Sequence, residues 1–167
     1  MKYDFEELVV NVKNDEYKLI GSGSSRRVYD LDNGHVLKIA KDIRGISQNK
    51  AEHEIYKSRK SNIFAEIVAV SEDNKFLIMS KARKIEKIST VYKYYNVRNY
   101  KKLVRLKNLK DDIQSNKLSR GDLVRPSSWG LIDDVPVIID YGLTQRIFKK
   151  YYRNRMLKRR KYKPIKL

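Results

Sequence analysis

The sequence predicts an α+β protein in which a small antiparallel-sheet lobe is followed by a reduced, mostly helical lobe, with a cleft between them. Two patterns lead to this prediction. Short β-rich runs separated by glycine, asparagine and serine fill residues 17–80. Polar stretches with apolar residues at helical spacing dominate residues 90–148. The chain has 167 residues, of which 41% are hydrophobic, which is sufficient for one compact domain or two small lobes.

The first half of the chain is predicted to form mainly strands. Residues 1–15 are expected to form an edge strand or a short helix. Strands are expected at 17–20, 28–31 and 35–40. The pair Asn33-Gly34 joins the second and third of these, because Asn-Gly is the strongest short-range hairpin signal.

A helix and a second strand pair are expected to complete this lobe. Ser47 is a plausible N-cap for a helix that ends near Arg59. Its apolar face would hold Ala51, Ile55 and Tyr56. Strands at 65–70 and 75–80 would then pair across the polar turn 71–74.

The second half of the chain reads mainly as helix. A helical region is expected over roughly Val91 to Ile113, with buried positions at Tyr95, Leu103, Leu106 and Leu109. A hairpin follows within 121–144, and a final helix begins near Thr144. Its apolar stripe would comprise Phe148, Tyr152 and Met156. The predicted division is a sheet lobe at 1–80, a connector at 81–89, a helical lobe at 90–148 and a basic C-terminal segment at 149–167.

Composition excludes several classes of site. The chain has no cysteine, which removes disulfides, thiolate zinc sites and cysteine nucleophiles. His35 and His53 are the only histidines, so a metal would be held by carboxylates. The acidic start MKYDFEELVV does not resemble a signal peptide, and no stretch approaches the length of a membrane span. We therefore expect a soluble, cytoplasmic protein.

The formal net charge of +18 is concentrated toward the C-terminus. Residues 149–167 contain ten Lys or Arg and no acidic residue. Such a segment is either a solvated surface or a contact for a polyanion, that is, nucleic acid, an acidic protein or anionic lipid. Residues 149–163 are the expected contact in the second case.

Two stretches of the sheet lobe suggest a phosphate site. The loop GSGSSRR, from Gly21 to Arg27, has no bulky side chain before Arg26, so its backbone N–H groups could approach phosphates closely. Lys38 lies in the apolar strand HVLKIA and should point away from Leu37 and Ile39. A lysine there needs a partner, and Glu52 on the following helix is the candidate. Glu54 is the competitor, but it points about 200° around the helix from Glu52, so only one of the two can face the sheet.

These stretches, taken in order, resemble an abbreviated protein kinase. The motifs that carry the resemblance are GSGSSRRV, VLKIA, NKAEHEIY, FLIMSKA, RGDL and VIIDYGLT, which span about residues 17–145. The most specific of them is the pair Asp122 and Asp140. Their separation of 18 residues is common between the catalytic-loop aspartate and the metal-binding aspartate of kinases. Asp140-Tyr141-Gly142 corresponds to the Asp-Phe-Gly motif of that family.

The resemblance implies ATP and Mg²⁺ as cofactors and assigns a role to each matching position. Lys38 would neutralise the α- and β-phosphates, Glu52 would hold Lys38, and Asp122 would deprotonate the attacking hydroxyl. Asp140 would bind the metal. Met79 would line the adenine pocket and the backbone of Ser80 to Ala82 would face the base. The nucleotide-binding positions implied are Gly21, Ser22, Gly23, Ser24, Val28, Lys38, Met79 and Lys81.

The sequence departs from the kinase pattern at several positions. Arg26 replaces the third glycine of the phosphate loop, and Ser127 stands where a second metal-binding asparagine is expected. Gly121-Asp122 is closer to the His-Gly-Asp of aminoglycoside and choline phosphotransferases. Val124 replaces the lysine typical of serine/threonine kinases, with Arg125 beside it. The simplest interpretation of Asp133 and Asp134 is that they form a turn.

The leading hypothesis is therefore an ATP- and Mg²⁺-dependent phosphotransferase that acts on protein Ser/Thr hydroxyls. A pseudokinase used as a scaffold is the first alternative, because of Ser127 and the shortened helical lobe. A nucleic-acid-binding protein that uses the basic segment is the second. A small-molecule kinase, suggested by Gly121-Asp122, is the third.

Overall fold

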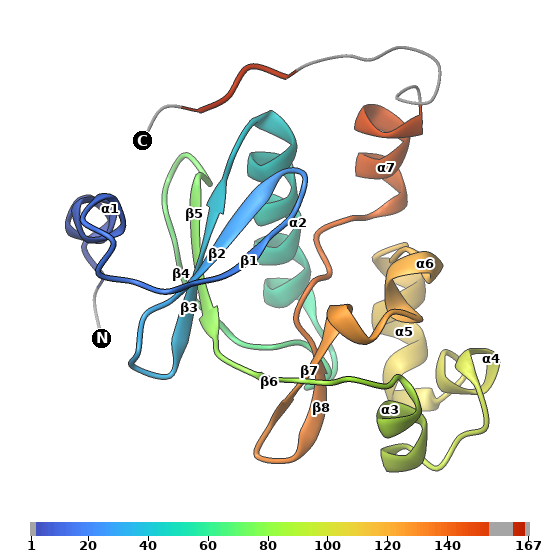
Figure 1. The fold of residues 1–167 in the computed structure, drawn as a ribbon. Helices are drawn as coiled ribbons and strands as arrows, with labels where there is room; N and C mark the ends of the chain where they lie inside the picture. Colours follow the sequence, from blue (N-terminus) through green and yellow to red (C-terminus); the bar gives the residue numbers. More distant parts are fainter. Residues whose placement is uncertain (1–2, 154–161, 166–167) are drawn as a thin grey trace.

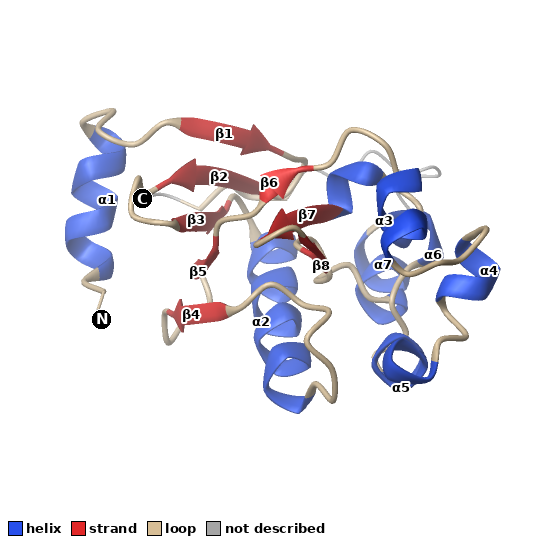
Figure 2. Cartoon of the chain, turned by 90° about the horizontal axis from the view of Figure 1, so that it is seen from below, coloured by secondary structure: helices blue, strands red, loops and turns tan. Residues whose placement is uncertain are grey.

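The computed structural model describes residues 3–153 and 162–165 and has the predicted α+β architecture (Figure 1). The sheet lobe contains a five-stranded antiparallel sheet. Its strand order is β1 (Leu19–Ser22), β2 (Arg26–Asp30), β3 (His35–Ala40), β5 (Phe76–Ser80) and β4 (Ile67–Val70). The helices of the second lobe gather at one end of this sheet (Figure 2).

Both faces of the sheet are covered, which explains why β3 is buried almost throughout. One face carries Leu37 and Ile39 and packs against α1 (Phe5–Lys13). The opposite face carries Val36 and Lys38 and looks toward α2 (Ile43–Ser58) and the helical lobe. The strand alternation predicted around Lys38 is therefore present. Of the two forms expected for residues 1–15, the helix is the one found.

The N-cap of helix α2 lies five residues before Ser47, the predicted N-cap. Asp42 is the N-cap, and its carboxylate accepts a hydrogen bond from the backbone N–H of Arg44 at 2.9 Å. Ser47 instead lies within the helix, and its hydroxyl donates to the carbonyl of Ile43. The prediction overlooked a stronger cap upstream.

The helical region predicted over residues 91–113 is present and is divided into three short helices. These are α3 (Ser89–Tyr94), α4 (Tyr100–Leu103) and α5 (Lys107–Ser115). Asn96 takes a left-handed conformation with φ of 49°, which ends the first helix, and Asn99 caps the second. Of the positions predicted to be buried, Leu103 and Leu109 are buried and Tyr95 and Leu106 are half-buried.

The predicted hairpin connects the two lobes. It consists of β7 (Trp129–Ile132) and β8 (Val135–Ile138), and β6 (Arg83–Lys84) adds a third strand. Asp133 and Asp134 form its turn, both with positive φ, as a type I′ turn requires. The backbone N–H of Ile138 donates to the carbonyl of Ile63 at 2.6 Å, so the hairpin is also attached to the segment that leads into β4.

Helix α7 (Gln145–Tyr151) packs with a different face from the one predicted. Ile147 and Tyr151 are buried, whereas Phe148 is 47% exposed and stacks on Tyr152. The buried pair faces α2, where the Tyr151 hydroxyl lies 3.1 Å from Ser47 Oγ. Met156, the third member of the predicted stripe, lies outside the described residues.

Residues 162–165 lie against the sheet lobe. The Tyr162 ring centroid is 4.6 Å from the guanidinium carbon of Arg44, and the Ile165 N–H donates to the Lys41 carbonyl at 2.7 Å. Within the described part of the chain, no helix is both long and apolar enough to cross a bilayer.

The first turn of α2 packs so closely on the phosphate loop that it has no room for a side chain at Gly45. A Cβ there would lie 2.3 Å from the Ser25 carbonyl and 2.8 Å from Ala40 Cα. We expect Gly45→Ala to lower the free energy of unfolding by about 1–2 kcal/mol, because overpacking outweighs the gain in helix propensity of roughly 1 kcal/mol.

Urea denaturation of the wild type, Gly45→Ala and the control Gly121→Ala measures this. Gly121 lies in the one-turn helix α6 (Arg120–Leu123), where the nearest atom to an added Cβ is 3.6 Å away. Equal stabilities of the two variants would contradict the close packing described.

Candidate active site

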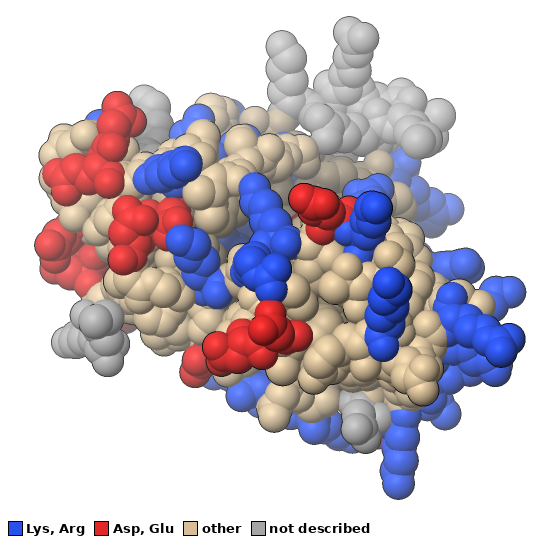
Figure 3. Space-filling model, turned by 60° about the horizontal axis from the view of Figure 1, so that its bottom comes forward, with Lys and Arg blue, Asp and Glu red and all other residues tan. Residues whose placement is uncertain are grey.

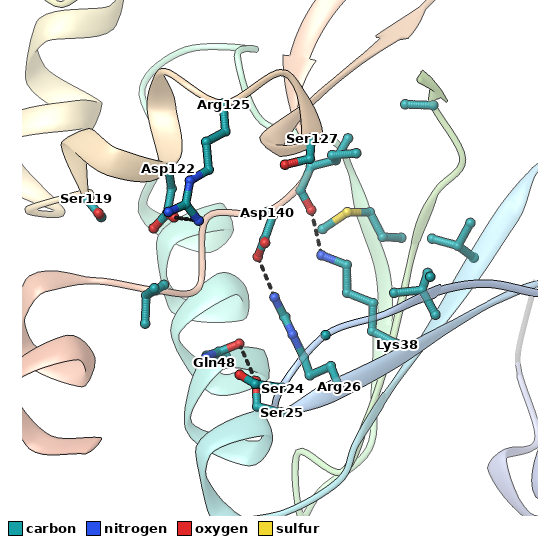
Figure 4. Close-up of a pocket in the computed structure, with 18 of the residues that line it drawn as sticks. Ser24, Ser25, Arg26, Lys38, Gln48, Ser119, Asp122, Arg125, Ser127 and Asp140 are labelled. Carbon is teal, nitrogen blue, oxygen red and sulfur yellow. Dashed lines mark hydrogen bonds and ion pairs between the residues drawn. The ribbon is translucent and has the colours of Figure 1, made fainter. Parts of the chain in front are cut away.

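A cavity of about 890 Å³ lies between the sheet lobe and the helical lobe (Figure 4). Its volume is typical of a small-molecule site. Nine of the positions singled out in the sequence line it: Gly21, Gly23, Ser24, Val28, Lys38, Met79, Asp122, Ser127 and Asp140. Ser22, Glu52 and Lys81 are not among the lining residues.

Glu52 lies behind the cavity, fully buried, and its two carboxylate oxygens have separate partners. Oε2 is 2.9 Å from Lys38 Nζ. Oε1 accepts hydrogen bonds from the backbone N–H groups of Tyr141 at 3.3 Å and Gly142 at 3.2 Å. Glu54, the competing glutamate of α2, is exposed and lies 3.9 Å from Lys50. The predicted Lys38–Glu52 pair is therefore present.

Lys38 is aimed at the segment that follows β8. Its ammonium also donates to the carbonyl of Ile139 at 2.6 Å. Burial lowers the pKa of Lys38, and the nearby charge of Glu52 opposes this effect. The ammonium thus stands at the edge of the cavity beside Asp140.

Arg26 makes contacts that the sequence did not predict. Its guanidinium is buried, with Nη1 2.9 Å from Glu52 Oε2 and Nη2 2.5 Å from Asp140 Oδ1. Nη1 also donates to Asn49 Oδ1 at 3.2 Å. Burial works against the guanidinium charge, but Glu52 and Asp140 outweigh it and raise the pKa of Arg26.

Asp140 differs from its neighbours in the motif because it faces the cavity. Its side chain is 52% exposed, whereas Tyr141 and Gly142 are buried. The Tyr141 hydroxyl donates to the Ala65 carbonyl at 3.2 Å, and its ring packs on Phe64. This anchoring fixes the position of the preceding carboxylate.

Glycine is required at position 142 for close packing and not for a positive φ. Among the described glycines, positive φ occurs at Gly34 and not at Gly142. A Cβ at Gly142 would lie 2.5 Å from the Gln48 carbonyl oxygen, so the residue lets this segment touch α2.

Asp122 reaches the same cavity from α6, on the opposite lobe. Its Oδ2 is buried and has no hydrogen-bond partner among the described residues. Arg125 Nη1 lies 3.6 Å from Oδ1, which is too long for a hydrogen bond. Burial raises the pKa of Asp122, and the charge of Asp140 raises it further. An unpartnered carboxylate oxygen at a cavity is suited to accept a proton from a ligand.

The phosphate loop leaves space where a ligand would approach. A Cβ would be 3.6 Å from the nearest atom at Gly21 and 3.9 Å at Gly23, so packing does not require glycine at either position. Both residues line the cavity, as does Ser24. Ser22 points elsewhere, and its hydroxyl accepts a hydrogen bond from Lys41 Nζ at 2.8 Å.

The segment expected to face an adenine base is only partly available. Met79 is buried on the cavity wall. The backbone N–H groups of Ser80 and Lys81 already donate to the carbonyls of Glu66 and Gly34. The Lys81 side chain, placed in the nucleotide site by the sequence, instead lies 2.5 Å from Asp30 at the end of β2. Ser80 and Ala82 line the cavity.

The described residues contain no group of three or more His, Cys, Asp or Glu side chains able to hold a metal alone. Beside nucleotides, one or two carboxylates hold Mg²⁺ together with phosphate oxygens. Asp140 is exposed enough to serve as such a ligand. Ser127 is exposed at the cavity, where its hydroxyl could be a second, weaker ligand.

Sequence reasoning missed a row of buried polar residues on α2. Gln48 and Asn49 are buried and flank the site. Gln48 accepts a hydrogen bond from Ser25 Oγ at 3.1 Å and donates one to the Tyr152 hydroxyl at 2.9 Å. The available signal was helical spacing, because Gly45, Gln48, Asn49 and Glu52 recur at i, i+3, i+4 and i+7.

The sequence matches no protein-family model and no curated protein. Among solved structures, the chain is similar to the streptomycin–ATP–APH(2″)-IIa ternary complex, with 18% identity and a TM-score of 0.39, over 71% of this chain and 42% of that one. It is also similar to the Mycobacterium tuberculosis PknI kinase domain, with 13% identity and a TM-score of 0.42, over 77% of this chain and 60% of that one. The chain thus spans less than two thirds of either structure.

Likenesses at this level carry no information on activity. The chain's own contacts are more specific. An antiparallel sheet, a helix that presents Glu52 to Lys38, and a hairpin between Asp122 and Asp140 occur in the order that the sequence predicts for a kinase-like fold. All of them meet at one cavity.

The buried carboxylate of Asp122 has a consequence for stability. Because the pKa of Asp122 is raised in the folded state, folding favours the protonated carboxyl. The stability of the protein is therefore unaffected by this charge below the ordinary pKa of 3.8, and it falls as pH rises through the folded pKa and the carboxyl ionises. We expect Asp122→Asn, which carries no charge, to be more stable than the wild type at pH 7 by on the order of 1 kcal/mol. The difference should vanish near pH 3.

Urea denaturation from pH 3 to pH 8 in EDTA measures this difference. Asp111→Asn on α5, at an exposed position, is the matched control and should follow the wild type. A difference for Asp122→Asn that does not change with pH would contradict the electrostatic origin of the effect.

Proposed function

We propose that the protein is an ATP- and Mg²⁺-dependent phosphotransferase that acts on a hydroxyl group, with protein Ser/Thr side chains as the acceptor. The observation that carries this proposal is the double engagement of Glu52. One oxygen holds the cavity-facing cation Lys38 and the other holds the backbone beside Asp140. Asp122 faces the same cavity from the other lobe.

The arrangement supplies the positioning and charge that phosphoryl transfer needs. Lys38 would bind phosphate oxygens, held in place by Glu52. The open backbone at Gly21 and Gly23 would lie over the phosphates. Asp140 would hold Mg²⁺ together with the phosphates, and the bound ion would supply charge neutralisation. The Ser127 hydroxyl would serve at most as a second, weaker ligand of the metal.

Asp122 would act on the acceptor. Its unpartnered oxygen would accept the hydroxyl proton as the acceptor oxygen forms its bond to the γ-phosphorus. The bond between that phosphorus and the β,γ-bridging oxygen breaks, and ADP leaves with the electron pair. The raised pKa of Asp122 favours this proton transfer, because it makes the carboxylate a stronger base.

Substitutions of the two aspartates should separate binding from chemistry. We expect Asp140→Ala to abolish Mg-ATP binding and transfer together, because it removes the metal ligand. Asp122→Asn should keep Mg-ATP affinity within about threefold but lower the transfer rate at least 10²-fold, because it removes the base. Calorimetric titration and transfer of label from γ-labelled ATP to a generic protein substrate measure the two effects.

Asp134→Asn, in the exposed hairpin turn, is the control and should leave both properties unchanged. Mg-ATP binding without transfer in the wild type would instead identify a pseudokinase scaffold. Transfer to a small-molecule hydroxyl but not to protein would identify a small-molecule kinase. Transfer that survives in Asp140→Ala would remove the proposal.

A second candidate function is polyanion binding, which one surface feature favours. Residues 87–110 contain eight Lys or Arg and no acidic residue. All eight side chains are exposed: Lys87, Lys93, Arg98, Lys101, Lys102, Arg105, Lys107 and Lys110. Basic side chains gather over the helical lobe (Figure 3). Tyr94, 52% exposed in the same stretch, would offer a stacking surface, which favours single-stranded nucleic acid. The basic residues 149–163, predicted from the sequence as a polyanion contact, would be a separate place of contact.

Replacing Lys101, Lys102 and Arg105 with Gln should weaken binding of a fluorescent single-stranded oligonucleotide at least tenfold and make its salt dependence shallower. The control replaces Lys13, Lys18 and Lys50, which are exposed on the sheet lobe, and changes the net charge equally. Equal losses in both triple variants would mean that only overall charge matters. Fluorescence anisotropy at several salt concentrations measures the affinities.

A further inference from the structure

Arg26 occupies the position in the active site where a metal-bound nucleotide would need free carboxylate oxygens. Its Nη2 lies 2.5 Å from Asp140 Oδ1, inside the cavity (Figure 4). Its Nη1 lies 2.9 Å from Glu52 Oε2, which also accepts a hydrogen bond from Lys38 at 2.9 Å. The guanidinium therefore binds the same carboxylate that the proposed function assigns to the metal.

These two uses of Asp140 compete. A divalent cation on this carboxylate and a buried guanidinium at 2.5 Å from one of its oxygens would repel each other. Lys38 is engaged elsewhere, because its ammonium contacts Glu52 and the Ile139 carbonyl. Arg26 is thus the cation that must give way.

We propose that Arg26 is a displaceable counter-ion: it holds Asp140 in the nucleotide-free protein, and it transfers to the γ-phosphate when Mg-ATP binds. This inference rests on the proposed function and adds to it a residue that controls metal access and distinguishes ATP from ADP. The planar guanidinium fits both partners, because it can bind either a carboxylate or a phosphate through two parallel N–H donors.

The contacts around Arg26 permit this movement. When Arg26 leaves, Glu52 Oε2 keeps Lys38 and Oε1 keeps its two backbone donors, so the buried carboxylate stays paired. Arg26 follows the exposed loop residues Ser22, Gly23 and Ser24 and lines the cavity with two of them. Its new partner would therefore be reached by a side-chain rotation at the start of β2.

Metal binding without nucleotide tests the first half of the proposal. We expect Arg26→Gln to bind Mn²⁺ at least tenfold more tightly than the wild type, because the competing charge on Asp140 is gone. Arg26→Lys keeps a cation and should stay close to the wild type. Adding Asp140→Asn to Arg26→Gln should remove the gain. Electron paramagnetic resonance of free Mn²⁺ measures these affinities.

The neighbouring residue supplies a matched control. Arg27 lies next to Arg26 on β2 but is exposed, so Arg27→Gln makes the same chemical change outside the site. It should bind Mn²⁺ as the wild type does. Equal Mn²⁺ affinities in Arg26→Gln and the wild type, with both proteins folded by circular dichroism, would overturn the inference.

Nucleotide titrations test the second half. In the presence of Mg²⁺, Arg26→Gln should lose at least tenfold of the wild type's preference for ATP over ADP, because the γ-phosphate loses a charged partner. An unchanged ATP/ADP ratio would show that Arg26 does not contact the γ-phosphate. Failure of the wild type and of Arg26→Gln to bind any nucleotide would defeat the proposed function, whereas the Mn²⁺ comparison would still decide the competition at Asp140.

Discussion

The carboxylate of Glu52 is the interaction on which the rest of the site depends. It is fully buried, and a buried charge is tolerated only when every lone pair direction is compensated. Lys38 and Arg26 meet one oxygen, and the backbone of Tyr141 and Gly142 meets the other. One side chain therefore joins the strand, the phosphate loop, α2 and the segment after the hairpin. Each of these elements can take its position only if the others do.

Much of this arrangement was predictable, because it follows from local periodicity. Strand alternation placed Lys38 opposite Leu37, and helical spacing selected Glu52 over Glu54. The turn at Asp133 and Asp134 also followed from local chemistry. The error at the start of α2 is local, because the cap at Asp42 was overlooked. The other errors come from tertiary contacts. The buried face of α7 packs on α2, where Tyr151 meets Ser47, and nothing local reveals that two distant carboxylates surround Arg26.

The two carboxylates that face the cavity destabilise each other electrostatically. Asp122 and Asp140 face it with like charges, and one oxygen of Asp122 is buried without a partner. The hydrophobic clusters on the two sides of the sheet and the anchoring of Tyr141 on Phe64 lie away from these groups and hold them in position. Unfavourable electrostatics of this kind are common in ligand-binding sites, because the bound ligand supplies the missing partner.

Gln48 connects the basic C-terminal segment to the phosphate loop through two hydrogen bonds. Its amide oxygen accepts from Ser25 at the end of that loop, and its amide nitrogen donates to Tyr152 just after α7. Both groups of this buried amide are hydrogen-bonded, so the Gln48 side chain cannot move away from one partner without also straining its bond to the other. The end of α7 and the phosphate loop therefore share one anchor on α2, and loss of the Gln48 amide would remove that anchor from both.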